Sequence, residues 1–118
     1  MEVEVRQHGN VTVVDLRGRV LINNGDILLR DTLVGLLQSG QRQILLNMAD
    51  VGYMDSSGIG EMVAGYRLAT DNGGQLKLLG CSDKLTELLE MTRLNRVFET
   101  FEDEAEALLS FPASPSSG

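Results

Sequence analysis

A run of mostly apolar residues at positions 44–48 lies between two segments with helical periodicity, and this arrangement constrains the fold most strongly. The preceding segment, residues 26–38, carries leucines at the i, i+4, i+7 and i+8 spacing of an amphipathic helix. The following segment repeats a helical stripe with Ile59, Met62, Val63, Tyr66 and Ala69. A strand that is apolar on both faces is typical of a parallel sheet covered by helices. The sequence therefore predicts an α/β fold.

The remaining segments extend the alternation of strands and helices in both directions. Val3 to Arg6 and Val11 to Arg17 are predicted to be strands around a turn at residues 8–10, and Gly18 is predicted to close the second strand. Downstream we predict a strand at Gln75 to Leu79, a helix capped by Ser82, a short edge strand at 97–101 and a last helix at 102–110. The predicted order is β-β-α-β-α-β-α-β-α, a small, mixed, mostly parallel sheet with four helices.

The length and composition indicate one domain. The chain has 118 residues, of which 42% are hydrophobic, enough for a core and too many for a disordered chain. We expect a single domain over residues 1–111. Residues 112–118 are rich in Pro and Ser and have no apolar stripe, which favours an unpacked tail.

The charge and the single cysteine exclude several classes of partner and compartment. A net charge of −7 disfavours nucleic acid and anionic membranes as partners. No apolar run has the length of a membrane span, and the start of the chain lacks a signal-peptide pattern. Cys81 has no second cysteine to pair with, which fits a reducing compartment. We therefore expect a cytoplasmic protein, either a monomer or a weak dimer.

The segment Asp55-Ser56-Ser57-Gly58 places two hydroxyls at a turn from strand to helix. The first N–H groups of a helix have no partner within it and attract anions, so a phosphate on Ser56 is tolerated there while it changes the local charge by about −1.5 to −2. The alternative interpretation is a helix cap, because Asp and Ser are preferred at that position. A cap needs only one side chain, however, and Gly58 and Gly60 weaken the helix that they begin, which suggests a close approach to the backbone.

Catalysis at these serines is not favoured. A serine nucleophile needs a base, and the only histidine, His8, lies far away along the chain. The glycines near 58 and 73 do not complete a phosphate-binding loop, and no His/Cys cluster has metal-ligand spacing. We therefore expect no enzyme activity, no cofactor and no metal.

Residues 43–65, which include Asp55-Ser56-Ser57-Gly58-Ile59-Gly60, resemble the signature of STAS-domain anti-sigma factor antagonists, which are bacterial regulators of sporulation and stress sigma factors. Two further segments, residues 73–78 and 88–98, resemble the same family, so the resemblance covers about residues 2–110. It implies the STAS fold. It also implies that Ser56 accepts phosphate from a serine kinase of histidine-kinase-like fold, which is itself the anti-sigma factor, and that a serine phosphatase removes it.

The implied partner-binding residues are Asp55, Ser56, Ser57 and Gly58, with Ser57 a neighbour of the acceptor. One position departs from the family pattern: Leu21 stands where many members carry an aspartate after the second strand. Asp26 is a candidate replacement for that aspartate, and the alternative is that it caps the helix that follows. A second hypothesis also stays open, in which the chain is a scaffold or transporter-associated STAS module without a phosphorylation switch.

Overall fold

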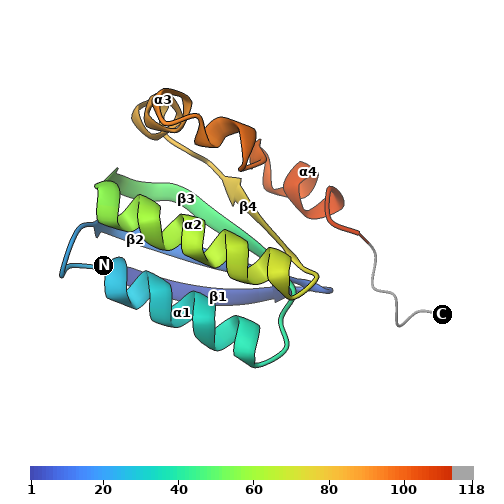
Figure 1. Ribbon diagram of the computed structural model, residues 1–118. Helices are drawn as coiled ribbons and strands as arrows, with labels where there is room; N and C mark the ends of the chain where they lie inside the picture. Colours follow the sequence, from blue (N-terminus) through green and yellow to red (C-terminus); the bar gives the residue numbers. More distant parts are fainter. Residues whose placement is uncertain (113–118) are drawn as a thin grey trace.

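The computed structural model describes residues 1–112 and consists of one mixed sheet with helices on both faces (Figure 1). The strands are β1 (Glu2–His8), β2 (Val11–Val20), β3 (Gln43–Met54), β4 (Gln75–Leu79) and β5 (Thr100–Phe101). The helices are α1 (Asp26–Gln38), α2 (Ser56–Asp71), α3 (Asp83–Met91) and α4 (Glu104–Leu109), with a short 3-10 helix at Leu94–Arg96. The sheet order is β1-β2-β3-β4-β5, antiparallel for the first pair and parallel for the others. The predicted fold class and element order are confirmed.

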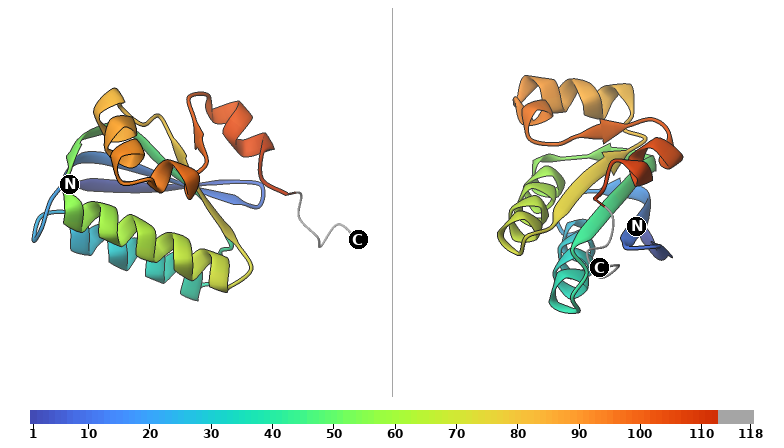
Figure 2. Two further views of the ribbon diagram at one scale, coloured as in Figure 1. Left: turned by 45° about the horizontal axis from the view of Figure 1, so that its top comes forward. Right: turned by 90° about the vertical axis from the view of Figure 1, so that its right-hand side faces the viewer.

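The larger core lies between the sheet and the helices α1 and α2, which pack side by side (Figure 2). Alternate residues of the central strands face this core, because successive side chains of a strand point to opposite faces. Leu33 of α1 packs so closely on α2 that a Cβ at Gly65 would lie 2.5 Å from its Cδ1. The buried residues on this side include Val14, Leu16, Leu29, Leu33, Ile44, Leu46, Met48, Met62, Leu76 and Leu78.

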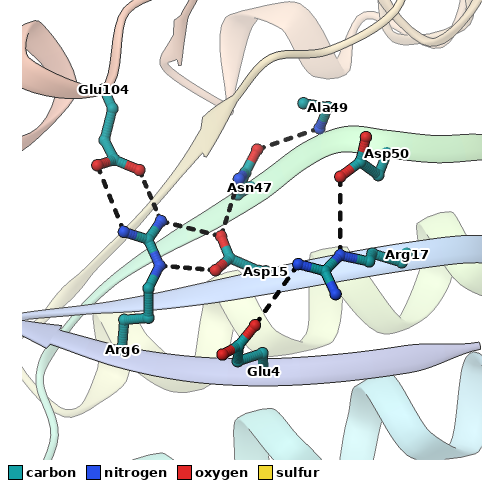
Figure 3. Close-up of polar contacts among 8 residues, drawn as sticks. All are labelled: Glu4, Arg6, Asp15, Arg17, Asn47, Ala49, Asp50 and Glu104. Atoms are coloured by element: carbon teal, nitrogen blue, oxygen red, sulfur yellow. Dashed lines mark hydrogen bonds and ion pairs between the residues drawn. The ribbon is translucent and has the colours of Figure 1, made fainter.

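The opposite face of the sheet is covered only in part, by α4. A second hydrophobic cluster, smaller than the core under α1 and α2, lies on this face and contains Val11, Val13, Leu45, Leu79, Ala107 and Phe111. Beside this cluster the face becomes polar, with side chains from β1, β2, β3 and α4 in one network (Figure 3). The Arg6 guanidinium donates to Asp15 Oδ2 at 2.6 Å and to Glu104 Oε1 at 2.6 Å. Its hydrogen bonds hold the pKa of the Asp15 carboxyl below the usual range.

Several boundaries differ from the prediction. Gly18 does not close the second strand: its φ of +106° accompanies a register shift, and β2 continues to Val20. β3 runs on to Met54, because its last residues pair with that extension and bury Val51 and Met54. The predicted edge strand at 97–101 is correct only for Thr100–Phe101, since residues 97–99 form an irregular turn after the 3-10 helix.

Other expectations are confirmed. Gly40, with φ +100°, follows the end of α1, and the Ser82 hydroxyl accepts from Leu85 N at 3.1 Å at the start of α3. Of the predicted tail, only Pro112 is described, and its carbonyl accepts from the Asn10 side chain at 2.9 Å. Residues 113–118 lie outside the described residues.

Candidate functional site

The turn between β3 and α2 is organised by the Asp55 carboxylate. Asp55 occupies the N-cap position, with φ −91° and ψ −175°. Its Oδ1 accepts from the backbone N–H of Ser57 at 3.0 Å and of Gly58 at 3.2 Å. These bonds satisfy two of the donors that a helix start leaves unpaired. The cap anticipated from the sequence is therefore present, but the aspartate forms it and neither serine does.

The two serines of the turn have different environments. The Ser57 hydroxyl is half-buried and donates to Asp55 Oδ1 at 2.7 Å. Ser56 is the first residue of α2 and is exposed, and its hydroxyl makes no hydrogen bond to any residue within 1–112. Of the two hydroxyls, only that of Ser56 is therefore without a partner within residues 1–112, while that of Ser57 supports the cap.

Asp55 also joins the turn to the loop after β2. The Asp55 N–H donates to the Val20 carbonyl at 3.0 Å, and the Ile22 N–H donates to Asp55 Oδ2 at 3.0 Å. The pKa of Asp55 is lowered from its usual 3.8, because hydrogen bonds to the carboxyl group favour its ionised form. The bond from the Ser57 hydroxyl has the largest effect, and the bond from the Ile22 N–H has the next largest. The turn therefore carries a fixed negative charge beside Ser56 at neutral pH.

The two glycines of the first turns of α2 serve different purposes. A Cβ at Gly58 would lie 2.7 Å from Met54 Cγ and 2.8 Å from Val20 Cγ1, so the start of the helix rests directly on β2 and β3. A Cβ at Gly60 would meet nothing within 4 Å. The close approach inferred from the sequence is thus intramolecular at Gly58, and Gly60 leaves an open patch of helix surface.

The segment with Leu21 and Asp26 lies at the end of the sheet where the turn between β3 and α2 is found. Leu21 and Asn24 exchange backbone hydrogen bonds of 2.8 and 2.9 Å in a tight turn, with Asn23 at φ +58°. Gly25 holds the N-cap position of α1 without a side-chain bond. Asp26 is therefore the first residue of the helix and not its N-cap, although its Oδ1 accepts from Ile27 N at 2.8 Å.

Several apolar side chains near this turn are exposed, and they were not predicted from the sequence as part of the site. Ile22 is 66% exposed and Tyr53 46% exposed, on the two segments that Asp55 joins. The end of β3 provides a signal for Tyr53, because the next residue, Met54, is buried and successive side chains of a strand point to opposite faces. Ile27 and Leu28 at the start of α1 are also exposed. Large apolar side chains on a polar rim are typical of protein contact surfaces.

Other kinds of site find little support in the part of the chain that the structure describes. His8 lies at the end of β1, beside the start of β2, whereas Ser56 follows the far end of the 12-residue β3. No group of three or more His, Cys, Asp or Glu side chains within residues 1–112 is arranged to hold a metal ion. Burial raises the pKa of Cys81 to about 11, which makes its thiol unreactive. Among the described helices, none is both long and apolar enough to cross a membrane.

Comparison with known proteins identifies the class. The STAS domain family matches residues 2–107, and the chain belongs to that family. The anti-sigma-B factor antagonist of Bacillus subtilis (strain 168) is 31% identical over 99 residues, which cover 84% of this chain and 89% of that protein.

Solved structures share the same fold. A Thermotoga maritima protein of known crystal structure aligns with a TM-score of 0.86 at 21% identity, over 92% of this chain and 93% of that chain. The phosphorylated form of SpoIIAA, a Bacillus cell fate determinant, aligns with a TM-score of 0.72 at 20% identity, over 91% of this chain and 96% of that chain.

Proposed function

We propose that this protein is an anti-sigma factor antagonist that acts by partner switching in the cytoplasm. With Ser56 unphosphorylated, the turn between β3 and α2 binds a serine kinase of histidine-kinase-like fold that is also the anti-sigma factor, and a sigma factor is released. Phosphorylation of Ser56 ends this binding, and a serine phosphatase restores it. Two relatives of this chain are named as anti-sigma factor antagonists, which supports this function.

The observation that carries the proposal is the difference between the two serines. The Ser56 hydroxyl is exposed and has no hydrogen-bond partner among residues 1–112, whereas the Ser57 hydroxyl is bound to Asp55. A kinase can therefore reach Ser56 without breaking the cap. Phosphorylation of Ser57 would first cost the 2.7 Å hydrogen bond to a carboxylate.

The electrostatics of the turn explain how a phosphate can block binding and leave the fold intact. The start of α2 carries the positive end of the helix dipole, which tolerates an anion at Ser56. The Asp55 carboxylate is already fixed in the same turn, so a phosphate would concentrate negative charge on one small surface. At an interface, desolvation and like-charge contacts of several kcal/mol are enough to dissociate a micromolar complex.

The surroundings of the turn suit a protein partner. Ile22 and Tyr53 expose apolar surface on either side of Asp55, and Asp26 lies at the end of the loop that begins at Leu21. In the proposed complex the apolar side chains become buried around the Ser56 hydroxyl, and Asp26 supplies the charged contact that Leu21 cannot make. The contact residues are then Asp55, Ser56, Ser57, Gly58 and Asp26.

The test is phosphorylation by the cognate kinase with ATP, read by mass spectrometry on three proteins. The wild type and Ser57→Ala should each gain one phosphate at Ser56, and Ser56→Ala should gain none. Both alanine variants should still bind the kinase. Phosphate on Ser56→Ala would overturn the assignment, and kinase binding without any phosphorylation of the wild type would favour a constitutive docking module.

A further inference from the structure

Strand β1 forms one edge of the sheet, and within residues 1–112 no other strand pairs with its outer side (Figure 2). All seven of its residues pair with β2 on the inner side. The opposite edge of the sheet is the two-residue β5. A long unpaired edge presents a row of backbone donors and acceptors to another chain, and proteins usually protect such an edge or use it.

The hairpin geometry identifies the free backbone groups of this edge. β1 and β2 are joined by the two-residue turn Gly9–Asn10, with Gly9 at φ +58°, and His8 faces Val11 as the closing pair. The closing pair of such a hairpin is hydrogen-bonded, and hydrogen-bonded and non-hydrogen-bonded pairs alternate along an antiparallel ladder. Val3, Val5 and Gln7 are then the residues whose N–H and C=O groups point outward.

We propose that β1 pairs antiparallel with β1 of a second copy of this chain, with the two-fold axis at Val5. In this register Val5 faces Val5, and Val3 faces Gln7 of the other copy. These three hydrogen-bonded pairs use all of the outward-pointing groups and supply about six backbone hydrogen bonds. The two sheets join into one continuous sheet, in which each residue of β1 has a partner on both sides.

The charges of β1 complement one another in this register. Glu4 of each copy lies directly opposite Arg6 of the other, in a non-hydrogen-bonded pair where side chains approach most closely. A shift by two residues either way places Glu4 opposite Glu4 or Arg6 opposite Arg6, which is unfavourable. The sequence Glu2-Val3-Glu4-Val5-Arg6-Gln7-His8 therefore favours one antiparallel self-pairing over its neighbours.

The side chains of Arg6 and Glu4, which would meet across this contact, differ in how firmly they are held (Figure 3). Arg6 is held in place by four hydrogen bonds to Asp15 and Glu104, and its side chain remains 34% exposed, so Glu4 of the second copy meets an ordered guanidinium with one N–H left on Nη1. Glu4 has only a loose ion pair with Arg17, at 3.5 Å between exposed groups, and is free to turn toward the second copy. Val5, at the axis, is 47% exposed and loses part of that exposure on pairing.

The dimer is expected to be weak and to leave the turn with Ser56 out of the contact. Each copy carries a net charge of −7, which opposes association at long range. The turn with Ser56 follows β3, and β2 lies between β3 and the paired edge. The dimer therefore presents two phosphorylation turns, and the proposal does not depend on the function proposed above.

Disulfide trapping tests the register. At the axis, the Cα atoms of two Val5 residues would lie about 5.5 Å apart, within the range that a disulfide bridges. The two Gln7 Cα atoms would lie about 14 Å apart, because four residues of strand separate them. Val5→Cys should cross-link under mild oxidation at high protein concentration, and Gln7→Cys should not. Equal cross-linking of both variants, or none in Val5→Cys, would overturn the proposed pairing.

Sedimentation equilibrium tests the association without a cross-link. The weight-average mass of the wild type should rise above 12.9 kDa as its concentration rises. Val5→Lys places two ammonium groups at the axis and should weaken association at least tenfold, although it brings the net charge closer to zero. Val5→Thr, also β-branched but neutral, should stay within about threefold of the wild type. A wild type that remains at 12.9 kDa up to about 1 mM, or a Val5→Lys variant that associates as well, contradicts the proposal.

Discussion

Helices α2 and α3 both begin after a strand with a polar cap, but they use their serines in opposite ways. At the start of α3, Ser82 is the N-cap, and its hydroxyl accepts from Leu85 N at 3.1 Å. At the start of α2, Asp55 is the N-cap, and both serines lie inside the helix. The third helical residue differs as well: it is Leu85 in α3, but in α2 it is Gly58, which touches β2 and β3. The Ser82 hydroxyl is therefore used by the fold, and so is that of Ser57, whereas the Ser56 hydroxyl has no partner within residues 1–112.

The largest effect on stability should come from filling the contact under Gly58. Gly58→Ala forces a Cβ against Met54 and Val20, and should lower the free energy of unfolding by about 1–3 kcal/mol. Gly60→Ala meets nothing within 4 Å and should stabilise the helix by about 0.5–1 kcal/mol. Urea denaturation of the two variants measures both. Equal effects would show that α2 is not pressed onto the strands, and lost kinase binding in Gly60→Ala would assign that open surface to the partner.

Alanine substitutions at the starts of α2 and α3 should distinguish Ser82, which caps a helix, from Ser56, which does not. Ser82→Ala removes a side-chain cap and should lower the free energy of unfolding by about 1 kcal/mol, or the melting temperature by about 4 °C. Ser56→Ala removes a hydroxyl without a partner and should change stability by less than about 0.5 kcal/mol. Asp55→Ala should lower the melting temperature more than Ser82→Ala, because Ile22 also loses its bond. A Ser56→Ala variant as unstable as Ser82→Ala would return Ser56 to a capping role.

The two caps should also differ in acid. The pKa of Asp55 in the folded protein lies below the ordinary 3.8 that it has when unfolded. Its contribution to stability is therefore complete above about pH 4 and is lost as the pH falls through the folded pKa. Asp55→Asn retains a cap that does not titrate, so its urea midpoint should fall less than that of the wild type between pH 6 and pH 2. Ser82→Ala should keep the wild-type slope, and equal slopes in all three proteins would contradict the ionised cap.

The smallest effect is expected at Asp26, which begins α1 without occupying its cap position. Asp26→Asn removes the charge and little else, so folding should hardly change. If Asp26 contacts the kinase through its charge, binding should weaken and its dependence on salt should flatten, because exposed charges are screened within about 10 Å at 0.1 M salt. Titrations at low and moderate salt measure this. Superimposable curves for both proteins would place the charged contact elsewhere.

The sequence predicted the fold well because the hydrophobic pattern determines it. The apolar residues of the run at 44–48 are buried, and of the predicted leucine stripe in 26–38 Leu29, Leu33 and Leu37 are buried and Leu36 is partly buried. The boundaries that were wrong depend on tertiary pairing: β2 passes through Gly18 because its register shift is compatible with β3, which no local pattern encodes. At the site, residue types alone could not say which of Asp55, Ser56 and Ser57 forms the cap. The exposure of Ile22 and Tyr53 likewise depends on how the loop after β2 folds onto Asp55.

A phosphate on Ser56 is expected to end kinase binding without altering the fold. The most direct measurement is a titration of the cognate kinase with the unphosphorylated protein and with the protein phosphorylated only at Ser56, accompanied by circular dichroism of both. We predict at least tenfold weaker binding of the phosphorylated protein, with superimposable spectra and a restored affinity after phosphatase treatment. Equal affinities would contradict a switch at this turn, and weaker binding together with an altered spectrum would show that the phosphate acts by disrupting the cap.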